Sequence, residues 1–324
     1  VDGLFVPHCN FGTEYEVCRL AKKLNVPVLL WGPRDECPDE NGMRLRDSQC
    51  GLFATGKVLR RFGIPFTYLK NCNLEDECFA EGIDRFLRVC NVVKAFRNTR
   101  VLQISTRPFD FWSTMCNEGE LLEKFGIQLS PIPMPELTQA MKDVKENSPE
   151  EIKEVTDYCR EKMCIKVTPE QLDNVAALKI AMTRLGKKYG CNCGAIQCWN
   201  ALQDEIGIMP CAANALCNDE GFPIACETDI HGTITSVLVE AAAMGETRSF
   251  FADWTVRHPY NDNAELLQHC GPWPISIAKE KPTIDTPVAF DCSGSLMAQA
   301  KDGEHISLVR FDGDNGEYSL LLGN

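Results

Sequence analysis

Positive charge is scarce in this sequence. Its 324 residues include 33 Lys and Arg against 46 Asp and Glu, which gives a net charge of −13. A chain that binds nucleic acid or an anionic membrane surface needs a basic face, so we expect neither partner. Long apolar runs are also missing: none approaches the roughly 20 residues needed to cross a bilayer. These absences favour an enzyme that acts on a small neutral molecule. Because the chain starts at Val1 without Met, we expect its natural start to lie upstream.

The sequence also lacks a G-x-G-x-x-G signature, which argues against a nicotinamide enzyme. Cysteine, in contrast, is abundant, with 18 residues. Their scatter through predicted helices and strands differs from the framework of small secreted disulfide proteins and favours mostly reduced, buried thiols in a cytoplasmic protein. A thiol metal cluster is a less favoured alternative, because the spacings match neither zinc nor iron–sulfur motifs. Its members would be Cys191, Cys193, Cys198, Cys211, Cys217 and Cys226.

The first block of the chain alternates strands with helices. Thr13 and Glu16 have the spacing of a capping box that opens a helix ending near Leu24. Continuous apolar runs such as Val26 to Trp31 are typical of strands buried on both faces of a parallel sheet. The other predicted elements are strands at 1–8 and 65–69 and helices at 49–62 and 75–95. This pattern predicts a doubly wound α/β domain over residues 1–97.

A second α/β block follows over residues 98–246. Its predicted elements are a strand RVLQIS, an aromatic loop STRPFDFW, a helix at 118–125 and a strand IQLSPIPM. They are followed by helical material at 136–164 that is interrupted at the Ser148-Pro149 cap, a helix at 168–189, and a strand CGAIQCW that ends at Trp199. After Met244 turns separate short strands: PVAFDC, SLMAQA, HISLVRF and EYSLLLG. We therefore expect two doubly wound α/β domains and then, over 247–324, a mainly antiparallel β domain that is incomplete in this chain.

Two carboxylates follow short apolar runs in the stretch from Ile224 to Gly271. Glu227 follows the run at 224–226, and Asp229 can cap a helix from His231 to Met244. Asp253 follows the run at 250–252, so the two carboxylates lie 253 − 227 = 26 residues apart, enough for one strand–helix–strand unit. Since open α/β sheets bind ligands at the carboxyl ends of their strands, we expect both at one crevice, with the imidazole of His269. Such a set suits a divalent cation like Mn²⁺.

The segments ACETDIHG, FFADW and QHCG, in this order, resemble the metal-site region of the L-fucose isomerase and L-arabinose isomerase family. The resemblance extends over nearly the whole chain, most specifically at GAIQCWNALQDEIGIMPCAANALCNDEGFPIACETDIHG. It implies that Glu227 and Asp253 bind Mn²⁺ and serve as acid/base groups, and that His269 is a metal ligand as in the arabinose branch. It also implies a homo-oligomer, commonly a hexamer, and a further histidine beyond Asn324. His305 lies in a predicted strand and is not assigned that role.

The predicted activity is the metal-dependent interconversion of an aldose of the fucose or arabinose type and its ketose through an enediol, with Glu227 and Asp253 transferring the protons. Predicted substrate-binding residues are Trp199, Asp229, Trp31 and Arg34, whereas a structural role is favoured for His8. Two other classes stay open. Paired α/β domains also build sugar receptors that perform no chemistry, and a lyase or aldolase uses the same kind of cation to stabilise an enediolate.

Overall fold

The computed structural model describes residues 1–287, 292–303 and 305–323. The chain divides into two compact units, Val1–Ala95 and Phe96–Asn324. The first predicted domain boundary, after residue 97, is close to this division, and the second, after residue 246, lies inside the second unit. The three-domain organisation stays a prediction. Among the described residues, no helix has both the length and the apolar character needed to span a membrane.

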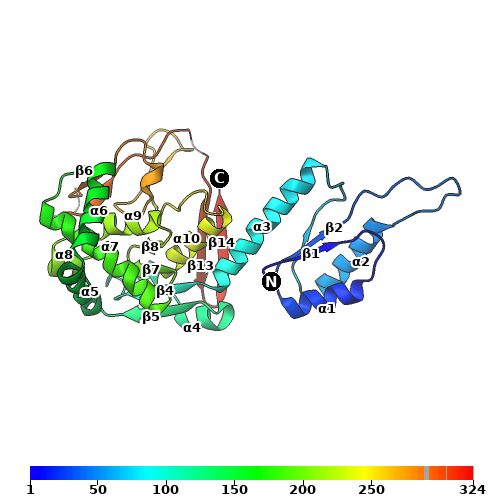
Figure 1. Ribbon diagram of the computed structural model, residues 1–324, viewed down its shortest axis with the longest axis horizontal. Coiled ribbons are helices and arrows are strands. Elements are labelled where there is room, and N and C mark those ends of the chain that lie inside the picture. Colours follow the sequence, from blue (N-terminus) through cyan, green and yellow to red (C-terminus); the bar gives the residue numbers. More distant parts are fainter. Residues whose placement is uncertain (288–291, 304, 324) are drawn as a thin grey trace. The chain divides into compact units, whose positions relative to one another are not determined.

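The first unit contains a three-stranded parallel sheet with the order β1-β2-β3 (Figure 1). All four residues of the central strand are buried, as its apolar sequence predicted. The strands are β1 (Leu4–Pro7), β2 (Val28–Trp31) and β3 (Thr67–Tyr68), and the helices are α1 (Glu14–Leu24), α2 (Ser48–Arg61) and α3 (Glu77–Arg97). Thr13 is the N-cap of α1, but its hydroxyl donates to the Glu16 carboxylate and caps no backbone group. The expected capping box is therefore not formed.

The second unit is built on a four-stranded parallel sheet with the order β5-β4-β7-β8 (Figure 1). Its strands are β4 (Arg100–Ile104), β5 (Gln128–Ile132), β7 (Cys193–Ile196) and β8 (Ile224–Ala225). Successive side chains of a strand face opposite sides. Leu102 and Ile104 join the larger apolar core, whereas Val101 joins a second core with Ile230 and Ile234. Helices therefore cover both faces of this sheet.

The helices on the two faces follow from local sequence signals. Thr168 and Gln171 form a complete capping box at the start of α7, with Pro169 at its first position. The stripe on α7 that was predicted to be core is buried: Leu172, Val175, Ala176, Ile180 and Leu185. The helices are α4 (Glu118–Glu120), α5 (Met134–Asn147), α6 (Pro149–Lys162), α7 (Pro169–Tyr189), α8 (Ala201–Ile206), α9 (Cys211–Asp219) and α10 (Ile230–Ala242), and the shorter turns are η1 (Trp112–Thr114), η2 (Leu121–Phe125) and η3 (Ile275–Ile277).

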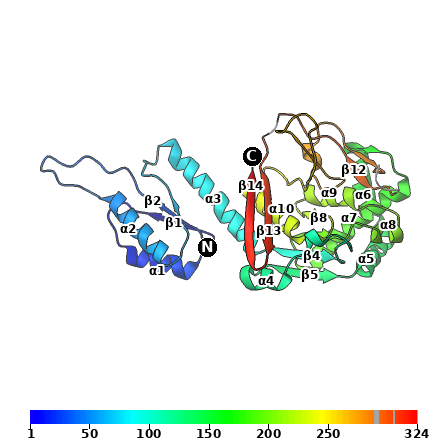
Figure 2. The ribbon, with the colours of Figure 1, turned by 180° about the vertical axis from the view of Figure 1, so that it is seen from behind.

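Antiparallel pairs dominate the carboxyl-terminal part, as expected. β9 (Asp253–Arg257) pairs with β10 (Glu265–Gln268), and β13 (Leu308–Asp314) pairs with β14 (Glu317–Gly323). The second pair lies against α10 (Figure 2), where the Phe311 N–H donates to the Thr235 hydroxyl at 3.0 Å. β11 (Thr283–Asp285) pairs antiparallel with β12 (Ser295–Met297) and parallel with β6 (Cys164–Ile165). The fold is thus mixed α/β, with parallel sheets followed by antiparallel strands.

Two strand predictions differ from the structure, and a third cannot be compared with it. The run Phe250–Ala252 forms no strand, and Asp253 instead begins β9. The strand predicted to end at Trp199 ends at Ile196. Most of the predicted strand PVAFDC, residues 288–291, lies outside the described residues.

Candidate functional site

Glu227 lies at the carboxyl edge of the parallel sheet, directly after β8. The backbone there is left-handed, with φ of 54° at both Glu227 and Thr228, a conformation that residues other than glycine adopt rarely. Ser105 after β4 (φ 65°) and Asn200 after β7 (φ 67°) share this feature at the same edge. Such strained positions persist only where surrounding contacts hold them, and they concentrate at functional sites.

Neighbouring segments hold the Glu227 turn in place. The Thr228 N–H donates to the Ile196 carbonyl of β7 at 3.0 Å, and its hydroxyl donates to the Thr106 carbonyl at 3.1 Å. The Thr114 hydroxyl reaches the Glu227 carbonyl at 3.4 Å. The turn is therefore fixed by β7 and by the aromatic loop that follows β4.

Asp253 and His269 come to the site from one hairpin. Asp253, the first residue of β9, pairs in register with Gln268, the last residue of β10, so His269 lies next to it. His269 Nε2 is 3.6 Å from Glu227 Oε2 and 4.0 Å from Asp253 Oδ2. The three predicted residues are thus brought together, although Asp253 arrives at the start of an antiparallel strand and not at the end of a parallel one.

The charges of these side chains influence each other. Burial lowers the pKa of His269, but contacts with Cys270 and Glu227 outweigh it and raise the pKa to about 10. The Gly271 N–H donates to Nδ1 at 3.3 Å, so the neutral ring carries its proton on Nε2. The protonated ring carries a proton there as well, and in both forms this proton faces Glu227. Desolvation raises the pKa of Asp253; His269 opposes this shift and Glu227 and Asp229 add to it. Since 68% of the Asp253 side chain is exposed, solvent screening weakens these interactions.

Glu227, Asp253 and His269 offer oxygen and nitrogen donors of the kind that a divalent cation binds, but among the described residues their donor atoms do not all lie within 4.8 Å of one another, so an ion would have to draw the two carboxylates together. Oxygen donors around such an ion are about 3 Å apart when adjacent and about 4 Å apart when opposite, given bonds of roughly 2.1 Å. Distances of 3.6 and 4.0 Å to His269 Nε2 are in this range. A histidine ligand, however, presents a lone pair to the metal and donates through its other nitrogen. His269 has the reverse arrangement, so it fits as a ligand only after a change of tautomer.

Comparison with known proteins finds relatives among sugar isomerases. The family model described as "Fucose/sulfoquinovose isomerase, N-terminal domain" matches residues 1–97. A sulfoquinovose isomerase from Alkalicoccus urumqiensis is 25% identical over 260 residues, which are 80% of this chain and 57% of that protein. Sulfoquinovose isomerases from Priestia aryabhattai and from Clostridium sp. (strain MSTE9) are each 24% identical over 279 residues and cover 86% and 85% of this chain. These matches support a fucose isomerase-like sugar isomerase family for this chain. It spans 57% to 61% of the length of these relatives.

Asp229, two residues after Glu227, is engaged in contacts within the fold. Its Oδ1 accepts from the Gly232 N–H at 2.8 Å and caps α10, as the sequence predicted. Both oxygens also face Arg310 of β13, at 2.5 and 3.3 Å. Only 8% of the Asp229 side chain is exposed. A contact with sugar would compete with these interactions, and the substrate-binding role of Asp229 stays a prediction.

Trp199 is half-buried beyond the end of β7. Its ring lies 5.2 Å from that of Phe111 at an interplanar angle of 59°. Phe111 belongs to the same aromatic loop whose Thr106 and Thr114 contact the Glu227 turn. The two rings thus adjoin the loop that borders the site, and stacking against a sugar stays a prediction for Trp199.

The other predicted residues lie in the first unit. Trp31 is 6% exposed, packs on Phe79 at 5.0 Å, and donates its indole N–H to the Cys72 carbonyl. Arg34 is exposed and lies 3.8 Å from the Asp76 carboxylate. His8 is buried and contacts the Thr55 hydroxyl at 3.1 Å, which agrees with a structural role. The substrate-binding roles of Trp31 and Arg34 stay predictions.

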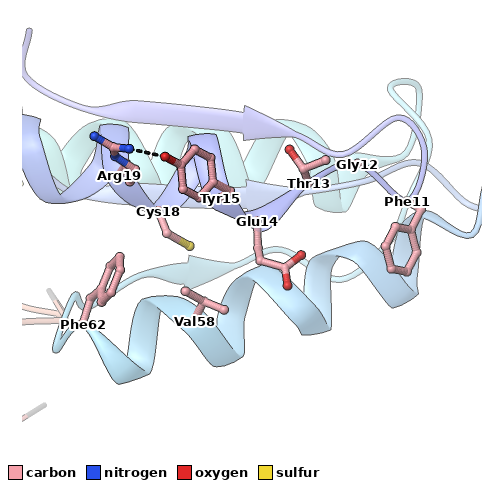
Figure 3. A pocket seen from close by; sticks show the side chains of 9 residues that line it. All are labelled: Phe11, Gly12, Thr13, Glu14, Tyr15, Cys18, Arg19, Val58 and Phe62. Atoms are coloured by element: carbon pink, nitrogen blue, oxygen red, sulfur yellow. Dashed lines mark hydrogen bonds between the residues drawn. The ribbon is translucent and has the colours of Figure 1, made fainter.

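This unit also has a pocket of about 480 Å³ beside α1 and α2 (Figure 3). Arg19 donates to the Tyr15 hydroxyl there, and Glu14 is the pocket's only carboxylate side chain among its lining residues. The pocket is lined by Phe11, Gly12, Thr13, Glu14, Tyr15, Cys18, Arg19, Val58 and Phe62. Because this pocket offers one carboxylate, it does not support a proton shuttle between two carboxylates. The group of side chains around Glu227 is therefore the stronger candidate site.

Two site neighbours were not singled out from the sequence for their roles. Arg310 binds Asp229 from 81 residues away, and no local pattern indicates that pairing. Cys198 donates its thiol to Glu227 Oε1 at 3.2 Å and accepts the Glu227 N–H at 3.3 Å. Cys198 follows the buried strand β7 at the same offset at which Glu227 follows the adjacent strand β8. This equivalent position was the sequence signal that could have indicated the contact. All 18 cysteines are free, and nine are buried, so the expectation of mostly buried thiols was right for half of them.

Proposed function

We propose that this protein interconverts an aldose and the corresponding ketose. The observation that carries the proposal is the convergence of Glu227, Asp253 and His269, with atoms 3.6 and 4.0 Å apart, at the carboxyl edge of a parallel sheet. Relatives of this chain are sulfoquinovose isomerases, which supports this class of reaction. A receptor that only binds sugar has no need for two carboxylates that face one buried imidazole.

Aldose–ketose isomerisation moves a proton between adjacent carbons through an enediol. Glu227 is one proton-transfer group and Asp253 is the other. Asp253, whose pKa is raised, is suited to hold a proton at Oδ2, and its exposure gives it access to a sugar that enters from solvent. Glu227 is 14% exposed, so the proton that its carboxylate takes from the sugar can exchange with solvent before it is returned.

Glu227 and Asp253 are the proposed holders of a divalent cation such as Mn²⁺. The cation would polarise the carbonyl and hydroxyl oxygens of the sugar and so acidify the C–H bond. His269 then positions the Glu227 carboxylate through Nε2 in the absence of the ion. Its role as a third ligand, implied by the arabinose branch, requires the tautomer change described above.

Sulfoquinovose is the first aldose to test, because the relatives carry that name. L-Fucose and L-arabinose, the sugars of the wider family resemblance, complete the panel. The homo-oligomer, its hexameric form and the cytoplasmic location remain predictions.

The test follows product formation by NMR for each aldose with wild type, Glu227→Gln and Asp253→Asn after reloading with Mn²⁺. Each variant keeps side-chain size and loses the ionisable group, so we expect kcat to fall about 10²- to 10⁴-fold. Glu265→Gln and Asp262→Asn are matched controls on the same hairpin, where Glu265 pairs with Arg257 at 3.1 Å away from the site. Both controls should retain wild-type rates.

Three outcomes separate the alternatives. A ketose with the same number of carbons identifies an isomerase, whereas shorter products identify a lyase or aldolase. Sugar binding without turnover identifies a receptor. Full activity of Glu227→Gln would show that the proton-transfer assignment is wrong even if the protein is an isomerase.

A further inference from the structure

Two buried thiols lie beside Glu227. Cys198 follows β7 and Cys226 follows β8, and these are neighbouring strands of the parallel sheet. The two sulfur atoms and a carboxylate oxygen of Glu227 all lie within 4.8 Å of one another. Cys198 is 2% exposed and Cys226 is 0% exposed, whereas Glu227 opens the group to solvent. The fold thus places two soft donors and one hard donor around one point.

Each sulfur already receives an N–H group. The Glu227 backbone N–H donates to Cys198 Sγ at 3.3 Å, and Asn214 Nδ2 donates to Cys226 Sγ at 3.5 Å. Such bonds orient the lone pairs of the sulfur atoms, as the outer partners of metal ligands do. His269 Nε2 lies 3.6 Å from Glu227 Oε2, but it carries a proton toward that carboxylate and is not a donor of this group.

We propose that Cys198, Cys226 and Glu227 form a binding site for a thiophilic divalent cation of the zinc class. Two thiolates and one carboxylate are three of the four donors of a tetrahedral zinc site, in which sulfur ligands are about 3.8 Å apart given bonds of roughly 2.3 Å and water can supply the fourth donor. Binding of the cation releases the two thiol protons to solvent, so charge and atoms balance. Manganese prefers oxygen donors, so this site selects a different ion from the one that serves isomerisation.

Occupation of this site would engage Glu227. This consequence, unlike the site itself, rests on the proposed function, in which the same carboxylate transfers a proton during turnover. A thiophilic cation would therefore inhibit the isomerase and compete with the sugar's own metal. The site would make activity sensitive to the supply of zinc-like ions.

Two other groups of thiols are weaker candidates. Cys72, Asp76 and Cys78 also lie within 4.8 Å of one another, but Asp76 accepts the Asn73 N–H at 2.8 Å and faces Arg34, so its charge is already compensated. Cys211 and Cys270 are 3.6 Å apart but belong to no three-donor group among the described residues. The experiment below therefore includes variants in both groups, to test whether either of them binds the cation instead.

The experiment is a titration of the apoprotein with Co²⁺, followed by the near-ultraviolet charge-transfer band that sulfur ligands produce. It uses a Cys78→Ala background, which removes the competing group in the first unit. We expect one equivalent of Co²⁺ with an intense band, displaced by Zn²⁺. Cys198→Ala and Cys226→Ala should each weaken binding at least tenfold and reduce the band, and Glu227→Gln should weaken binding while the band remains.

Cys217→Ala is the matched control, because Cys217 is a fully buried thiol that contacts Thr183 and not Glu227. It should leave the titration unchanged, and circular dichroism checks that every variant is folded. Absence of the band, or its survival in both Cys198→Ala and Cys226→Ala, would overturn the proposal. Loss of the band only in Cys211→Ala or Cys270→Ala would overturn it as well. None of these readings depends on turnover, so they are independent of the isomerase assignment.

Discussion

Replacement of Arg310 by Met should destabilise the second unit strongly. Arg310 of β13 holds both oxygens of Asp229, whose side chain is only 8% exposed. Removal of one partner from a buried ion pair costs about 3–5 kcal/mol, because the other charge is left buried without compensation. Arg310 itself is 34% exposed, so water reaches part of the vacated position and we expect a loss of about 3 kcal/mol, at the lower end of that range.

The double variant Asp229→Asn with Arg310→Met is the informative control. Asn is as good an N-cap as Asp, so the contact with Gly232 is kept while the stranded charge is removed. We expect the double variant to recover to within about 1.5 kcal/mol of wild type. A double variant as unstable as Arg310→Met alone would show that lost packing, and not the buried charge of Asp229, explains the effect.

Urea unfolding followed by tryptophan fluorescence measures these differences. Four of the five tryptophans belong to the second unit, so the signal reports mainly on it: Trp112, Trp199, Trp254 and Trp273. A change of less than 1 kcal/mol in Arg310→Met would refute the reasoning, since it would mean that the Asp229 charge is well solvated without Arg310.

Three further substitutions test the site and the core. Gly271→Ala adds a Cβ 2.4 Å from Cys211 Cβ and 2.6 Å from its Cα, so the backbone after His269 must shift. We expect the free energy of unfolding to fall by about 1–3 kcal/mol and kcat to fall as well. Unchanged unfolding and activity would contradict this. Trp199→Ala should raise KM more than it lowers kcat if its ring, beside Phe111, stacks on the sugar, and steady-state kinetics measures the split. Leu178→Ala, at a fully buried position of α7, should cost about 2–5 kcal/mol in urea unfolding and leave KM unchanged.

Local sequence signals predicted the elements around Glu227 well. The apolar run before it is a buried strand, and Asp229 caps the next helix within one residue of the expected start. At α7, Thr168 and Gln171 form the full capping box, whereas the same kind of pattern at Thr13 and Glu16 produced only a contact between side chains. A capping pattern therefore located both helix starts but did not determine the hydrogen bonds.

Long-range arrangement was the limit of prediction. The three-residue run before Asp253 was too short to distinguish a buried strand from a loop, and β9 is exposed along its whole length. Asp253 still reaches the predicted site because the β9–β10 pairing places it beside His269. The contacts of Arg310 with Asp229 and of Cys198 with Glu227 join segments 81 and 29 residues apart, and no periodicity encodes such pairs.

Exchange of solvent deuterium into the sugar tests the central claim most directly. The protein, reloaded with Mn²⁺, is incubated with sulfoquinovose, L-fucose or L-arabinose in D₂O, and NMR follows the carbon next to the carbonyl. If Glu227 and Asp253 transfer protons through an enediol, one aldose should gain deuterium at that carbon as its ketose forms, and Glu227→Gln should abolish both. Ketose formation without any deuterium in either sugar, or deuterium uptake that continues unchanged in Glu227→Gln, would contradict proton transfer by this carboxylate.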